Sequence, residues 1–63
     1  MNSTEKILFS PAETAIILGI GRSKVYEFLK NGELRSVTIG RSRRIHEKDI
    51  DAFIKLLIQR GIA

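Results

Sequence analysis

The chain of 63 residues contains no cysteine, one histidine and one proline, and it has no long hydrophobic run. Without cysteine it can form neither a disulfide nor a thiolate metal site, which fits a reducing compartment. A single histidine, His46, is too little for a metal site, so we interpret it as a strand-end or capping residue. No segment approaches the roughly 18 apolar residues of a membrane span, and residues 1–6 lack the layout of a signal peptide. We expect one soluble, cytoplasmic domain over residues 1–63, with a flexible start at residues 1–6.

The sequence also lacks a catalytic arrangement. No nucleophile, base and orienting group can be assembled from its residue types and order. Asp49 and Asp51 are better explained as charges that favour the start of a helix. The glycines at 19 and 21 do not have the spacing of a phosphate-binding loop, and they follow a helix rather than a strand. We therefore expect no enzymatic activity, no cofactor and no metal.

The basic residues are concentrated in one stretch of the chain. Residues 22–44 contain seven Lys or Arg and two Glu, a net charge of +5, whereas the other residues together carry −1. Concentrated positive charge in a small domain is typical of a surface that binds a polyanion. An ordinary solvated surface is the alternative, and the structure of this stretch decides between the two.

Two helices are predicted in the first half of the chain. Ser10 and Pro11 form a strong helix start, and Glu13 completes a capping-box pattern, so a helix is expected from Pro11 to about Leu18. Residues 19–21 suit a tight turn whose middle residue, Ile20, enters the core. A second helix is expected over about 22–30, ending at Asn31 and Gly32, with an apolar face made of Val25, Phe28 and Leu29.

A hairpin and a third helix are predicted in the second half. Residues 36–39 alternate as a half-buried strand does, residues 40–42 form a turn, and residues 43–46 return with Ile45 toward the core. The last helix is expected over about 47–60, with an apolar stripe made of Ile50, Phe53, Ile54, Leu57 and Ile58. Residues 7–9 suit either a strand fragment or a packing staple. The predicted fold class is mainly α with a small β-hairpin, a winged helix-turn-helix.

This arrangement indicates duplex DNA as the polyanion. The second helix of a helix-turn-helix presents its N-terminal half to base edges, and here that half carries Arg22, Ser23, Lys24 and Glu27. Arg22 and Lys24 can donate to guanine or phosphate, and Glu27 can accept from cytosine or orient one of the two cations. Additional contacts to the DNA backbone are expected from Tyr26, Lys30 and Arg35, and the hairpin supplies Arg41, Arg43 and Arg44 to the backbone or a minor groove.

The order of these short motifs resembles the excisionase-type, MerR-like DNA-binding domains over roughly residues 8–58. The matching pieces are residues 9–15, 18–20, 22–26, 31–34, 37–40, 43–45 and 49–54. The resemblance implies that the second helix enters the major groove and that the hairpin acts as a wing. Excisionases, also called recombination directionality factors, bind and bend attachment-site DNA and help an integrase excise a mobile element, often as cooperating copies. Two positions depart from the family pattern: His46 replaces a Ser-like cap, and Arg35 stands where proline is common.

Three further interpretations stay open. The chain can instead be a small transcriptional regulator of a phage or plasmid, or a protein-interaction adaptor, for which the outward-facing Ile16 and Leu56 are the candidate contacts. Arg44 can pair with Asp49 or Asp51 instead of touching DNA. Ile17 is expected to face inward, Phe28 to belong to the core and Tyr26 to its edge.

Overall fold

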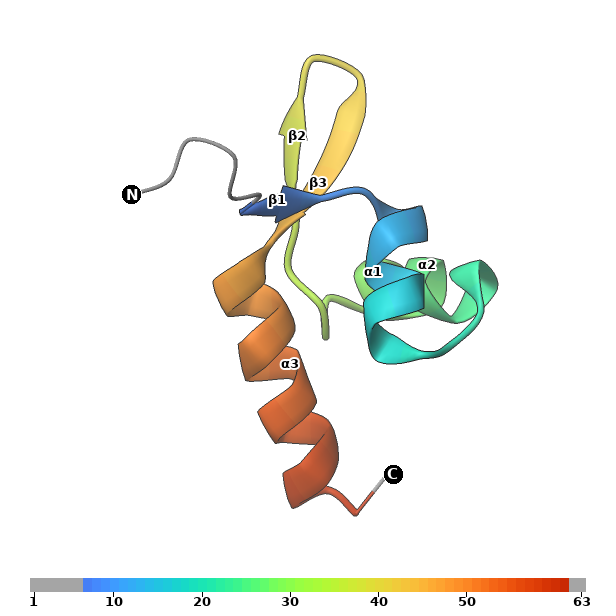
Figure 1. Ribbon diagram of the computed structural model, residues 1–63, viewed down its shortest axis with the longest axis vertical. Helices are drawn as coiled ribbons and strands as arrows, with labels where there is room; N and C mark the ends of the chain where they lie inside the picture. Colours follow the sequence, from blue (N-terminus) through green and yellow to red (C-terminus); the bar gives the residue numbers. More distant parts are fainter. Residues whose placement is uncertain (1–6, 62–63) are drawn as a thin grey trace.

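The computed structural model describes residues 7–61, so the predicted flexible start at residues 1–6 lies outside the described residues. The elements follow one another as β1 Leu8–Phe9, α1 Pro11–Leu18, α2 Arg22–Asn31, β2 Val37–Ile39, β3 Ser42–His46 and α3 Glu47–Gln59. Helices α1 and α2 lie on one side, α3 runs away from the sheet, and the hairpin of β2 and β3 projects from the opposite end (Figure 1). The predicted helices and hairpin strands are confirmed to within one residue at each end.

Helix α1 begins with the predicted capping box. The hydroxyl of Ser10 accepts a hydrogen bond from the N–H of Glu13 at 3.1 Å, and the carboxylate of Glu13 accepts one from the N–H of Ser10 at 2.9 Å. Thr14 is fully buried and donates its hydroxyl to the carbonyl of Ser10 at 2.9 Å, so its burial leaves no unpaired polar group. Gly19 ends the helix in the left-handed conformation, with φ of 69°.

The sheet has three strands rather than the two predicted. Strand β3 lies in the middle and pairs antiparallel with β1 on one side and β2 on the other. Of the two possibilities for residues 7–9, the strand is confirmed, with Leu8 opposite His46 and Phe9 opposite Ile45. The N–H of Glu47 donates to the carbonyl of Ile7 at 2.9 Å, which joins the entrance of β1 to the start of α3.

The core lies where the three helices meet the sheet. Phe28 and Phe53 join α2 to α3, because their rings lie 4.8 Å apart in an edge-to-face arrangement at 61°. Ile20, in the turn between α1 and α2, packs against the core as predicted. The buried apolar residues are Ala15, Val25, Leu29, Leu34, Ile45, Ile50 and Phe53.

The sequence pattern wrongly predicts burial at both ends of the molecule. Val37 and Ile39 alternate with polar residues, yet their side chains are 48% and 57% exposed. Strand β2 is an edge strand of a hairpin that projects beyond the helices, so no described element covers it (Figure 1). Ile58 belongs to the predicted stripe of α3 but is 67% exposed, since α3 extends past the other helices near its C-terminal end.

Candidate nucleic-acid interface

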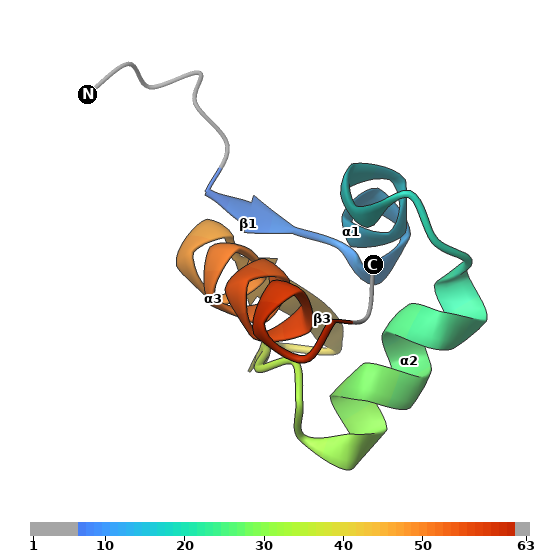
Figure 2. The same ribbon diagram turned by 90° about the horizontal axis from the view of Figure 1, so that it is seen from below.

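Helix α2 separates a buried apolar side from an exposed polar side. Val25 and Leu29 hold it in the core. In the view of Figure 2, α2 lies at the periphery of the molecule. All of the DNA-contacting side chains predicted on this helix are exposed: Arg22, Ser23, Lys24, Tyr26, Glu27 and Lys30. A large ligand can therefore reach these side chains without disturbing the core.

The first turn of α2 combines a cation with unused backbone donors. The Nζ of Lys24 lies 3.6 Å from the Oε1 of Glu27, so Glu27 orients Lys24, one of the roles predicted for it. Gly21 caps the helix without any side-chain hydrogen bond, in contrast to Ser10 at the start of α1. The N–H of Lys24 already donates to the carbonyl of Gly21 at 3.1 Å, but no side chain caps the N–H groups of Arg22 and Ser23, so these two groups and the positive end of the helix dipole can face an anion such as a DNA phosphate.

The basic hairpin, residues 37–46, has a short turn formed by Gly40 and Arg41. Ile39 and Ser42 are the pair that closes it. Gly40 has φ of 62°, whereas no other residue type among residues 7–61 has positive φ, so the turn has the pattern of type II′. Such a turn matches the twist of the two strands, and it places Arg41 at the tip of the projecting hairpin.

The register of the basic hairpin places its arginines on different faces. Arg43 pairs with Thr38 and Arg44 with Val37, and adjacent residues of a strand point to opposite sides. Arg43 is exposed, while Arg44 is half-buried and donates from its guanidinium to the carbonyl of Arg43 at 3.0 Å. Within residues 7–61, Arg44 forms no ion pair with Asp49 or Asp51 within 4.0 Å, so the predicted alternative role is not adopted.

Arg35 lies apart from the other predicted contacts. It is exposed and borders a shallow hollow of about 330 Å³ beside α3, together with Asp49 and Leu56. Leu56 is half-buried there, whereas Ile16 on α1 is 81% exposed. Of the two predicted protein contacts, Ile16 is therefore much more accessible than Leu56.

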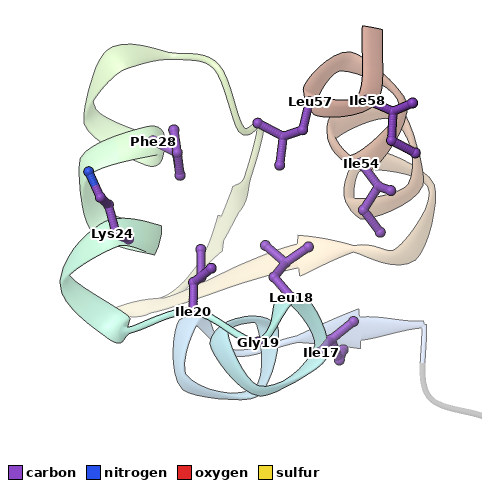
Figure 3. A pocket seen from close by; sticks show the side chains of 9 residues that line it. All are labelled: Ile17, Leu18, Gly19, Ile20, Lys24, Phe28, Ile54, Leu57 and Ile58. Carbon is purple, nitrogen blue, oxygen red and sulfur yellow. The ribbon is translucent and has the colours of Figure 1, made fainter. Parts of the chain in front are cut away.

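An apolar groove that the sequence did not reveal runs between the helices. Its volume is about 610 Å³, and Figure 3 shows side chains from the end of α1, the following turn, α2 and α3 directed around it. Ile17, predicted to face inward, is 49% exposed at its border. The spacing of Ile54 and Ile58 places them on one side of α3, but only the tertiary arrangement shows that they lie opposite Ile20 and Phe28. The groove is lined by Ile17, Leu18, Gly19, Ile20, Lys24, Phe28, Ile54, Leu57 and Ile58.

Within the described part of the chain, no three or more His, Asp or Glu side chains gather in a way that could hold a metal ion. Among residues 7–61, no helix is long and apolar enough to span a membrane.

Comparison with known proteins agrees with this arrangement. Residues 8–55 match the family described as helix-turn-helix domain. The chain is 43% identical over 53 residues to a protein of Saccharopolyspora erythraea named "Probable excisionase", which covers 84% of this chain and 54% of that protein. It is also 40% identical over 43 residues to "Putative DNA-binding protein Rv0500A" of Mycobacterium tuberculosis, which covers 68% of this chain and 55% of that protein. No solved structure gives a significant match.

The chain spans about half the length of the curated relatives it matches. The predicted likeness to excisionases is supported by the family match and by the first relative, whereas the MerR-like part of that likeness stays a prediction. The helix-turn-helix is a DNA-binding motif in which the second of two helices is the recognition helix. Helices α1 and α2, joined by a turn with two glycines, occupy those places, and the chain belongs to the helix-turn-helix domain family.

Proposed function

We propose that this protein is a sequence-specific, non-enzymatic DNA-binding protein of excisionase type, which binds and bends attachment-site DNA to promote excision by an integrase. The observation that best supports this proposal is that α2 has a buried apolar side and exposed polar residues. Its apolar side is fixed in the core through Val25 and Leu29, and every polar residue of this helix that is expected to touch DNA is exposed. The name of the relative from S. erythraea supports the excision role.

In this proposal, α2 lies in the major groove and discriminates between bases. Arg22 and Lys24 donate to guanine or phosphate, and Ser23 and Glu27 add short-range hydrogen bonds to base edges. The Lys24–Glu27 ion pair gives the ammonium a preferred position and leaves oxygen atoms of Glu27 free to accept from a cytosine amine. Tyr26 and Lys30, farther along the exposed side, contact phosphates.

The basic hairpin is the wing of the proposed complex. Arg41 and Arg43 are exposed on it, and residues 34–46 contain no acidic side chain that would neutralise them. Arginine is favoured both at phosphates and in a narrow minor groove. Arg44 adds charge at the base of the hairpin, and Arg35 adds a backbone contact beside α3. These contacts supply affinity with little base information.

Bending and cooperation complete the proposed role. A duplex held both by a helix in its major groove and by a hairpin in the next minor groove is deformed when the two sites do not fit straight DNA. Neighbouring copies and an integrase are the proposed protein partners. Ile16 is the main candidate contact because its side chain is 81% exposed, and Leu56 is the lesser one.

The test is selection of bound duplexes from a pool with a randomised core, followed by footprinting on the DNA that flanks the protein's own gene. We expect one preferred sequence, and protected sites repeated at short regular spacing. The genes beside its own are then searched for an integrase, and excision is measured by adding such an integrase to a plasmid carrying the footprinted site. Equal binding to selected and random duplexes at physiological salt would refute specificity. Specific binding without any effect on excision would leave a DNA-binding protein with a different role.

A further inference from the structure

The basic hairpin carries an apolar surface that the proposed arginine contacts do not explain. Ile39 is 57% exposed and Val37 is 48% exposed, although the hairpin around them bears three arginines. Exposed apolar side chains are common singly, but here two lie on one face of the same short strand. Because these two side chains lie on the hairpin that projects from the rest of the molecule, they suit a ligand that can contact both apolar and cationic side chains.

Ile39 lies closest to the tip of the hairpin. It pairs with Ser42 across the turn, so only Gly40 and Arg41 lie farther out. Val37 is two residues back, which places it roughly 6–7 Å farther from the tip along the strand. The minor groove of B-DNA is about 7.5 Å deep. A hairpin that enters tip-first therefore brings Ile39 toward the groove floor and leaves Val37 near its mouth.

Insertion of this tip requires the minor groove to open. The two strands alone lie about 4.8 Å apart, and the groove is only about 6 Å wide before side chains are counted. Architectural proteins open the groove by placing an apolar side chain between two stacked base pairs, which bends the duplex toward the major groove. An exposed isoleucine beside an arginine that holds the phosphates is the combination such an entry needs.

We propose that Ile39 is an apolar wedge: it enters the minor groove beside Arg41, partly unstacks one base step and produces the bend. This rests on the proposed DNA-binding function and assigns the bending step within it to one side chain. The charge of the hairpin favours DNA over a second copy, because two such hairpins would bring six arginines together. Flexible TA or CA/TG steps are the preferred site, since they unstack with the least cost.

The probe is the duplex recovered by the selection described above, labelled at its ends for energy transfer and carrying 2-aminopurine at successive positions under the hairpin. The test variant is Ile39→Thr, which keeps a β-branched side chain suited to a strand. The matched control is Val37→Thr on the same strand and face. Circular dichroism of both variants confirms that the fold is retained.

The wild-type protein is expected to shorten the end-to-end distance and to brighten 2-aminopurine at one step. Ile39→Thr removes the brightening and most of the bend, but it retains the wild-type salt dependence of binding. Val37→Thr retains the brightening, the bend and the salt dependence of binding. Arg41→Ala gives the opposite result, since it lowers the salt slope by about one and leaves the brightening in the saturated complex.

Several results would overturn the wedge. If the wild-type protein binds specifically but neither bends the duplex nor brightens 2-aminopurine, the wedge is wrong and the DNA-binding function stands. The same holds if Ile39→Thr bends DNA as the wild type does, or if it abolishes only the joint binding of neighbouring copies, which would make Ile39 a protein contact. Absence of selective binding by the wild type would overturn the proposed function and the wedge together.

Discussion

Helix α2 and the basic hairpin carry similar charge on differently supported backbones. Val25 and Leu29 anchor α2 in the core, and the Phe28–Phe53 ring contact ties it to α3. In the hairpin, all three residues of β2 are exposed, and Ile45 is the only residue of residues 37–46 that is fully buried. The position of α2 is thus set by tertiary packing, whereas the hairpin depends mostly on its own register and turn.

This difference suits two kinds of DNA contact. Hydrogen bonds to base edges need donors and acceptors at fixed positions, and a helix held by the core provides them. Contacts to phosphates tolerate displacement, and a hairpin attached at one end can follow a deformed duplex. In the proposed complex, the five positive charges in excess over residues 22–44 are therefore divided between a helix that reads bases and a hairpin that holds the DNA backbone.

The largest expected effect is a loss of stability, and it differs between a truncation in α2 and a truncation in the hairpin. Leu29→Ala removes a buried side chain from α2 and should cost about 2–5 kcal/mol of unfolding free energy, which approaches the whole stability of a domain this small. Ile39→Ala removes the same number of carbon atoms from an exposed site and should cost less than about 1 kcal/mol. Urea denaturation followed by circular dichroism measures both. Equal losses would mean that the hairpin is packed as firmly as the helix.

The second prediction concerns discrimination by α2. Glu27→Ala removes a base-edge acceptor and frees Lys24 from its ion pair. Preference for the selected base at one or two positions should fall by about 1–3 kcal/mol. Competition binding with singly substituted duplexes measures this loss. Lys30→Ala, on the same helix but farther from its N-terminus, serves as control and should weaken all duplexes alike. If Glu27→Ala weakens every duplex equally, α2 does not read bases through this residue.

The third prediction concerns the hairpin. Arg43→Ala should weaken binding to selected and random duplexes by the same factor and lower the slope of log K against log salt by about one. Arg41→Ala should behave in the same way. Lys55→Ala removes a cation that is also exposed, from α3, and should leave the slope unchanged. Titrations at several salt concentrations give the slopes. An altered base preference in Arg43→Ala would instead assign sequence reading to the hairpin.

The contrast also explains what the sequence could predict. The bounds of α1 follow from the capping box of Ser10 and Glu13 and from Gly19, all of which act within one turn of the helix. The pairing of β1 with β3 joins residues more than thirty positions apart, and no local pattern specifies it. The alternation in residues 36–39 wrongly predicts half-burial of Val37 and Ile39, because a strand pattern indicates an apolar face without showing whether another element covers it. The exposed side of α2, on which the DNA contacts are proposed, could be predicted because helical spacing alone separates the face of Val25 from that of Glu27.

The fourth prediction tests the junction between the hairpin and α3. The Nδ1 of His46 accepts a hydrogen bond from the N–H of Lys48 at 3.0 Å, so His46 caps α3 where β3 ends. His46→Ala should destabilise the protein by about 1 kcal/mol. His46→Asn restores a capping acceptor and should recover most of that loss. Urea denaturation measures the unfolding free energy of both variants. If His46→Asn loses as much stability as His46→Ala, the packing of the imidazole ring stabilises the protein here and the cap does not.

The smallest expected effect concerns the ion pair between Arg60 and Glu33, which lies beyond the C-terminal end of α2. Arg60, which follows α3, donates to the carboxylate of Glu33 at 2.9 Å, and the two side chains are 46% and 30% exposed. This ion pair joins the end of α3 to the loop after α2, and no ion pair of comparable sequence separation holds the hairpin within residues 7–61. Because the pair is solvated, a double-mutant cycle of Glu33→Gln and Arg60→Gln should give a coupling below about 1 kcal/mol. The coupling should fall further in high salt, since screening weakens exposed pairs. A salt-independent coupling well above that value would show that the support of α2 is partly electrostatic, and the contrast with the hairpin would then no longer rest on the apolar core alone.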